Sequence, residues 1–149
     1  MGLLRLDSVG IVVDNMDEVV SFFLGLGFIY ISDTVKSGAW LESVTGVKGA
    51  EIQVTLLQSP QAETHIEFIQ YSPEVHLAPP IDPRILRPGF RMVGVLVEDL
   101  KGTIDLAVSL GANPIGNGIE RVDAFWVSYI LAPGNVIIML AEDVPWDEL

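Results

Sequence analysis

The chain has 149 residues, half of them hydrophobic, and a formal net charge of −12. This length and composition suit one folded domain with its own core and exclude a disordered chain. The acidic excess disfavours binding to nucleic acid phosphates, and the absence of cysteine excludes disulfides, thiolate metal sites and a cysteine nucleophile. No apolar run is long enough to span a membrane and no signal peptide is apparent, so we expect a cytoplasmic protein without a membrane partner.

The first half of the chain predicts the order β-α-β-β-β. Residues 5–13 are rich in valine and isoleucine and end at Asp14 and Asn15, which is typical of a buried strand followed by a helix cap. Over residues 16–25 the apolar side chains recur at helical spacing. The rest is read as a Gly-containing loop at 33–49, which carries Trp40, and as strands at 28–32, 51–58 and 64–71.

The second half predicts the same order after a connector. Five prolines fall within residues 72–89, which excludes a helix or a central strand there. We expect a strand at 90–97, a helix at 100–110, and strands near 114–115 and at 124–131 and 136–141. The chain is therefore divided into a first module (1–73), a Pro-rich connector (74–89) and a second module with an acidic tail (90–149), all within one structural domain.

The second module repeats the first. Residues 8–16 (SVGIVVDNM) align with residues 92–100 (MVGVLVEDL), 84 positions later. Near the module ends, residues 66–68 (IEF) align with residues 138–140 (IML), 72 positions later, so the second module is about 12 residues shorter in the region after its helix. An internal repeat of this kind implies two similar supersecondary units.

The opening segment VGIVVDN (9–15) and the closing segment PGNVIIMLAE (133–142), set in a tandem β-α-β-β-β repeat, resemble the vicinal oxygen chelate superfamily. That superfamily includes glyoxalase I, methylmalonyl-CoA epimerase, extradiol dioxygenases, and the bleomycin and fosfomycin resistance proteins. The resemblance covers about residues 4–142. It implies an α+β fold whose curled mixed sheets surround a shared cleft, and it implies a homodimer.

The resemblance also implies where metal ligands would lie. In the family's enzymes each module supplies a His that opens its first strand and a Glu or Gln on its last strand. The two His positions fall on Ser8 and Met92, and the two carboxylate positions fall on Glu67 and Met139. Divalent ions need nitrogen and oxygen donors, usually three or more from the protein, so we expect no metal and no other cofactor at this site.

Two titratable side chains remain as candidates for chemistry. Strand side chains alternate, so His65 and Glu67 share one face. A carboxylate desolvated beside Met92 and Met139 is in the usual condition of a general acid or base, with His65 assisting. The structural alternative is a Glu67 held by an arginine or by water at the sheet edge, with His65 simply half-exposed at the start of its strand.

Three aromatic residues are candidates for lining a ligand pocket together with Ser8, Met92 and Met139. The resemblance places Trp40 in a loop that often overhangs the cleft. Trp126 and Tyr129 lie on one strand with opposite parity, so only one of them faces inward. Such rings can stack on a planar ligand, or they can serve ordinary core packing.

Three functions follow as hypotheses. The first is a metal-independent pocket that binds or sequesters a small hydrophobic or aromatic compound, as the bleomycin resistance proteins do. The second is a metal-free lyase, isomerase or cyclase in which Glu67 moves a proton and His65 assists. The third is a metal-dependent glyoxalase, epimerase or dioxygenase with rearranged ligands, for which His65, Glu67 and His76 form one candidate set.

Overall fold

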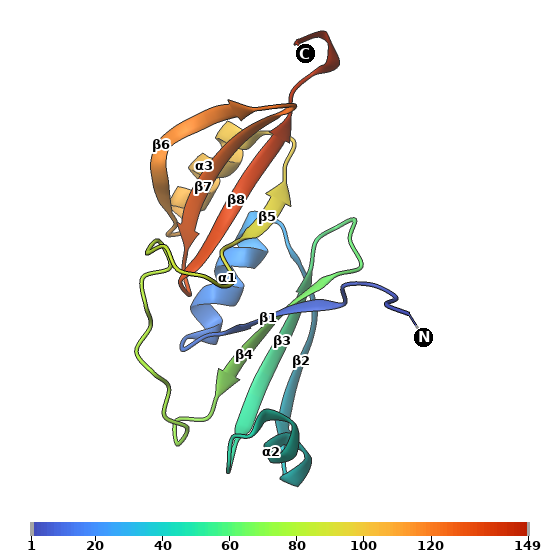
Figure 1. Cartoon of the computed structure of the whole chain (residues 1–149), viewed down its shortest axis with the longest axis vertical. Helices are drawn as coiled ribbons and strands as arrows, with labels where there is room; N and C mark the ends of the chain where they lie inside the picture. The colour runs from blue at the N-terminus through green and yellow to red at the C-terminus, as the bar shows by residue number, and fades with distance from the viewer. Residues whose placement is uncertain (1, 149) are drawn as a thin grey trace. The chain divides into compact units, whose positions relative to one another are not determined.

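The computed structural model describes residues 2–148 (Figure 1). The chain divides into two compact units, Met1–Ala78 and Pro79–Leu149, and the boundary falls inside the predicted connector. Each unit contains one four-stranded mixed sheet with a long helix on one face, which confirms the predicted α+β fold of two tandem modules. No helix within residues 2–148 is both long enough and apolar enough to cross a bilayer.

The first unit holds a sheet in the order β1-β4-β3-β2, with β1 and β4 parallel and the other pairs antiparallel. Its elements are β1 (Ser8–Val12), α1 (Met16–Leu26), β2 (Ile29–Ser37), α2 (Ala39–Thr45), β3 (Glu51–Gln58) and β4 (His65–Tyr71).

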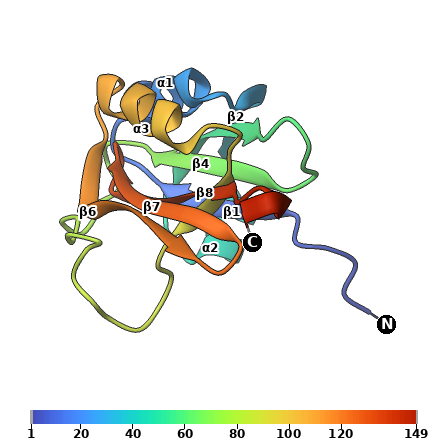
Figure 2. The same cartoon turned by 90° about the horizontal axis from the view of Figure 1, so that it is seen from above.

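The second unit holds a sheet in the matching order β5-β8-β7-β6, again with the outer pair β5 and β8 parallel. Figure 2 shows α3 lying over the strands of this sheet. The elements are β5 (Val93–Leu96), α3 (Leu100–Ser109), β6 (Asn113–Val122), β7 (Phe125–Ala132), β8 (Val136–Asp143) and a short 3-10 helix (Trp146–Glu148).

The register of the parallel pairs confirms the repeat. Val9 of β1 lies opposite Ile66 of β4, and Val93 of β5 lies opposite Ile138 of β8. These partners are related by the same offsets, 84 and 72 residues, that align the two halves of the sequence. The two units therefore share a backbone hydrogen-bonding frame as well as an order of elements.

The hydrogen bond that caps the first turn of the helix is also the same in α1 and in α3. The side chain of Asn15 accepts a hydrogen bond from the amide of Glu18 (3.2 Å), and that of Asp99 accepts one from Gly102 (2.9 Å). An Asn or Asp side chain at this position accepts a hydrogen bond from one of the amides that have no partner in the first turn of a helix. Both caps agree with the turn predicted after the first strand of each module.

A second contact ties each helix start to the last strand of its own unit. Gln70 of β4 accepts a hydrogen bond from the amide of Met16 (2.7 Å), and Glu142 of β8 accepts one from Leu100 (2.6 Å). Gln70 and Glu142 occupy equivalent positions in the repeat. The second unit thus uses a charged side chain where the first uses a neutral amide.

The predicted loop at 33–49 was wrong. Strand β2 continues to Ser37 because it pairs with β3 along its length, and residues 39–45 form helix α2 between Gly38 and Gly46. Residues 38–50 separate β2 from β3, whereas only residues 123 and 124 separate β6 from β7. The connection that contains α2 thus accounts for most of the length difference between the two modules.

Strand β6 is also longer than the short strand expected near 114–115. It runs from Asn113 to Val122, and its pairing with β7 is interrupted by a register shift between Ile115 and Glu120. Gly116 and Gly118 lie in this interruption with positive φ, a backbone region that glycine adopts at little cost. Gly116 and Gly118 interrupt the alternation of side chains along the strand, and for this reason only a short strand near 114–115 was predicted.

The main core of each unit lies between its helix and one face of its sheet. In the first unit Phe23 is fully buried and its ring contacts those of Phe22, Phe28 and Phe68 at centroid distances of 5.5, 5.3 and 4.9 Å. In the second unit the buried side chains include Leu100 and Ala107 of α3 and Ile130, Ile138 and Leu140 of the sheet. The opposite face of each sheet is left to other residues.

Candidate functional site

The first sheet has a second face, directed away from α1. Because strand side chains alternate, His65 and Glu67 of β4 lie on this face, while Ile66 and Phe68 point into the α1 core. The same alternation puts Leu56 of β3 on the face with Glu67, its register partner. We call this side of the sheet the open face.

Helix α2 covers one end of the open face. Its buried Leu41 forms a small apolar cluster with Ala50, Ile52 and Val54, against which partly buried side chains pack. The partly buried members are Val47, Leu56, Ile69, Tyr71 and Val75. This second core leaves the other end of the face, around Glu67 and His65, uncovered by α2.

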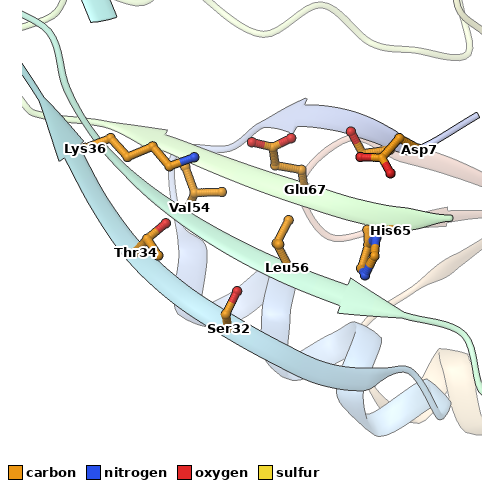
Figure 3. A pocket seen from close by; sticks show the side chains of 9 residues that line it. Asp7, Ser32, Thr34, Lys36, Val54, Leu56, His65 and Glu67 are labelled. Carbon is orange, nitrogen blue, oxygen red and sulfur yellow. The ribbon is translucent and has the colours of Figure 1, made fainter. Parts of the chain in front are cut away.

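The uncovered end is hollowed, with a volume of about 230 Å³. Figure 3 shows the hollow from close by, with side chains from β2, β3 and β4 and from the start of β1 around it. The lining residues are Asp7, Ser8, Ser32, Thr34, Lys36, Val54, Leu56, His65 and Glu67.

The hollow has an apolar floor between two polar rims. Leu56 of β3 lies opposite Glu67 of β4 on one side and opposite Ser32 of β2 on the other. The rim formed by β1 and β4 carries Ser8, which is the register partner of His65. The other rim, formed by β2, carries Ser32, Thr34 and Lys36, and the floor consists of Val54 and Leu56.

The polar side chains around the hollow differ in whether they have partners. The carboxylate of Asp7 is bound by the guanidinium of Arg5 at 2.9 Å. Within residues 2–148, the side chains of Glu67, His65 and Lys36 make no hydrogen bond or ion pair with the protein. All three are half-buried. Three polar groups thus face one hollow with their hydrogen-bonding capacity free.

The structure brings together three of the residues predicted from the sequence in the first unit. Ser8, His65 and Glu67 all line the hollow. Trp40 does not: it lies in the first turn of α2 and its side chain is 53% exposed. Sequence reasoning missed Ser32, Thr34 and Lys36, because four of the five residues in the segment SDTVK are polar and no alternation of polar and apolar side chains indicates a strand there.

The predicted residues of the second unit lie on its sheet. Tyr129 of β7 is the register partner of Met139 of β8, so these two share a face with Gly94 of β5. Trp126 has the opposite parity and lies on the face that also carries the buried Ser128 and Ile130, with the Arg121 guanidinium 6.0 Å from its ring centre. Met92 directly precedes β5 and is half-buried.

A profile of the Glyoxalase/Bleomycin resistance protein/Dioxygenase superfamily matches residues 5–123. The chain belongs to this superfamily. The assignment confirms the resemblance to vicinal oxygen chelate proteins that the repeated segments indicated. No curated protein sequence matches the chain.

Solved structures of the superfamily share the fold. A glyoxalase family protein from Bacillus cereus is 25% identical, with a TM-score of 0.90 over 97% of each chain. A glyoxalase family protein from Enterococcus faecalis is 15% identical, with a TM-score of 0.64 over 93% of this chain and 97% of its own. TnmS3, an antibiotic binding protein from Streptomyces sp. CB03234, is 13% identical, with a TM-score of 0.62 over 96% of this chain and 98% of its own.

The superfamily implies a divalent metal, but the side chains at the implied ligand positions do not fit one. Glu67 supplies a carboxylate, whereas Ser8, Met92 and Met139 supply a hydroxyl and two thioethers, which are poor ligands for zinc, magnesium, manganese or iron. In the described part of the chain, no three His, Asp or Glu side chains gather in a way that could hold a metal ion. This holds for His65 and Glu67 with either Asp7 or His76 as a third donor.

Proposed function

We propose that this superfamily member binds a small organic molecule on the open face of its first sheet, without a metal ion, and that Glu67 is the main polar contact. The observation that carries the proposal is the free carboxylate of Glu67 in a hollow that it shares with free His65 and Lys36. The polar atoms of these three side chains are not cut off from solvent, so a ligand can replace water at them without breaking a contact within the protein.

The floor of the hollow supports the expected apolar character of the ligand. The half-buried Leu56 offers an apolar surface between the two rims for a hydrophobic or aromatic group, while Val54 beside it is only 2% exposed. TnmS3, a fold relative, is described as an antibiotic binding protein. Binding of an antibiotic is thus a use that one protein of this fold is described as serving.

A second candidate is a metal-free lyase or isomerase. It is favoured by the placement of His65 and Glu67 two positions apart on β4, both lining the same hollow. Glu67 would take a proton from an acidic carbon of the substrate and return it to another carbon or to the leaving group, and His65 would donate a hydrogen bond to the atom where negative charge develops. A placed proton-transfer group contributes roughly 10²–10⁴-fold to a rate, which suits an already activated substrate.

The test is ligand-observed NMR of the full chain against a library of small aromatic fragments, together with mass spectrometry of molecules that co-purify with it. We compare the wild type with Glu67→Gln and with Glu51→Gln, which makes the same charge change on the other face of β3. We expect the wild type and Glu51→Gln to bind the same fragments, and Glu67→Gln to lose about tenfold or more in affinity for those with a hydrogen-bond donor or positive charge.

Two results would overturn the proposal. One is equal binding by Glu67→Gln and the wild type. The other is a stoichiometric zinc, nickel, manganese or iron ion whose removal by a chelator abolishes binding. The two candidate functions separate on the fate of a bound compound: a binding protein releases it unchanged, whereas for an enzyme Glu67→Gln keeps affinity and loses turnover.

A further inference from the structure

We infer that the ligand of the open face carries both a positively charged group, bound at Glu67, and a negatively charged group, bound at Lys36. This inference rests on the proposed function and names the chemical class of its ligand. It follows from which charged side chains around the hollow are already neutralised, and from where the remaining ones stand.

The charges left free are one of each sign. Asp7 also lines the hollow, but Arg5 occupies its carboxylate at 2.9 Å. Among the described residues, the four ion pairs involve neither Glu67 nor Lys36. A ligand that contacts both rims therefore meets an unpaired carboxylate on β4 and an unpaired ammonium on β2.

The two side chains start from opposite rims, but the Lys36 stem brings its ammonium back across the floor (Figure 3). Strand β3 lies between β4 and β2, so the two rims are two strand spacings apart, roughly 10 Å. In Figure 3 the Lys36 side chain extends across Val54 toward the Glu67 side of the hollow. The stem of a lysine that packs on apolar surface in this way keeps its ammonium at the polar end.

These positions fix an arrangement of groups on the ligand. An ammonium or amidinium group binds at Glu67, where His65 and Ser8 add hydrogen-bonding capacity. A carboxylate or phosphate group binds at Lys36, where the hydroxyl of Thr34 lies on the same rim. A flat ring that carries both groups would rest on Leu56, the half-buried apolar residue between the rims.

Three matched probes test the inference by calorimetry and by amide chemical shifts of the full chain. The probes are 4-(aminomethyl)benzoate, which carries both charges, benzylamine, which carries the positive one, and benzoate, which carries the negative one. We expect the doubly charged probe to bind at least tenfold more tightly than either of the others. Its shifts should map to β2 and β4 of the first sheet.

The variants assign each charge. Glu67→Gln should weaken the doubly charged probe and benzylamine about tenfold and leave benzoate unchanged, since a charge-assisted contact is lost. Lys36→Met should weaken the doubly charged probe and benzoate and leave benzylamine unchanged. Lys48→Met and Glu51→Gln, which change the net charge equally away from the hollow, control for the long-range field of an acidic protein.

Several outcomes contradict the inference. If the doubly charged probe binds no better than benzylamine and Lys36→Met changes nothing, the ligand has no negatively charged group, while a loss in Glu67→Gln still supports the proposed function. If no probe binds the wild type at millimolar concentration, the inference that the ligand carries both charges is wrong. The fragment screen then tests the proposed function separately. Lys36→Gln serves as the second variant if Lys36→Met fails to fold.

Discussion

The two sheets are built on the same frame, but the faces directed away from their helices have opposite chemistry. On the first sheet the face carries free polar groups, and on the second the equivalent positions are mostly apolar. Applying the repeat and the strand registers together pairs Ser8 with Met92, His65 with Ile137, Glu67 with Met139, Ser32 with Ile115, Leu56 with Tyr129, and Lys36 with Val122.

The opposite faces do not differ in this way. Phe68 in the first sheet and Leu140 in the second are both fully buried, as are Leu57 and Ile130. Burial of these side chains against α1 and α3 supplies the main apolar stabilisation of each unit. The helix-covered faces are thus alike in the two units, and the units differ in their other faces, one of which carries the carboxylate of Glu67.

The largest expected effect comes from exchanging one equivalent pair. Ile137 is 2% exposed, so Ile137→His places an imidazole among apolar neighbours and should destabilise the protein by about 3 kcal/mol. The reciprocal His65→Ile removes a half-buried group that has no protein partner and should change stability by about 0.5 kcal/mol or less. Urea denaturation of both variants measures the difference.

The matched control is Ile137→Val, which keeps the position apolar and should cost about 1 kcal/mol. Equal destabilisation by His65→Ile and Ile137→His would mean that His65 supports the fold. The contrast between a functional face and a structural one would then fail.

A smaller effect distinguishes the contacts that tie each helix to its sheet. Glu142 offers a carboxylate to the amide of Leu100 at the start of α3, and Gln70 offers a neutral amide to Met16 at the start of α1. Hydrogen bonds to charged groups are stronger than neutral ones, and a negative charge is favoured at a helix N-terminus. Glu142→Ala should therefore cost about 2 kcal/mol and Gln70→Ala about 1 kcal/mol.

Hydrogen exchange at the amides of α3 and α1 measures the two losses separately. Glu142→Gln is the control, because it keeps the contact and removes the charge, and its cost should equal the difference between the other two, about 1 kcal/mol. Equal protection in Glu142→Ala and Gln70→Ala would show that the charge at the second helix adds nothing.

The sequence predicted those parts of the fold that follow from periodic patterns. The strands at 51–58 and 64–71 agree with β3 and with β4, which begins at His65, because each is a short run rich in apolar and β-branched residues and a turn separates the two. Helix α2 was missed because seven residues give too few turns for a helical period, and because its flanking glycines read as loop.

The site was predictable in part. Alternation along β4 was enough to put His65 and Glu67 on one face, and the family resemblance singled out Glu67. Lys36 was not identified as a site residue because residues 33–49 were predicted to form a loop. Only the pairing of β2 with β3 shows that the Lys36 side chain faces the same hollow. Arg5 neutralises Asp7, while Glu67 stays free. This difference depends on how individual side chains are placed, which a periodic sequence pattern does not predict.

The smallest effect concerns the connector, which the repeat does not cover. There the guanidinium of Arg84 binds the carboxylate of Asp82 at 2.7 Å and lowers the pKa of Asp82 from 3.8 to about 2. A lowered pKa in the folded chain contributes stability above the unfolded pKa, and this contribution is lost as the pH falls through about 2. The net effect on the free energy of unfolding should be very small, because the ion pair is exposed. Its partners are two residues apart, so much of their interaction persists in the unfolded chain.

A carbon-13 titration of the Asp82 carboxyl should give a low pKa in the wild type and an ordinary one in Arg84→Gln, with denaturation midpoints unchanged between the two at neutral pH. An ordinary pKa for Asp82 in both proteins would show that its contact with Arg84 is not formed in solution.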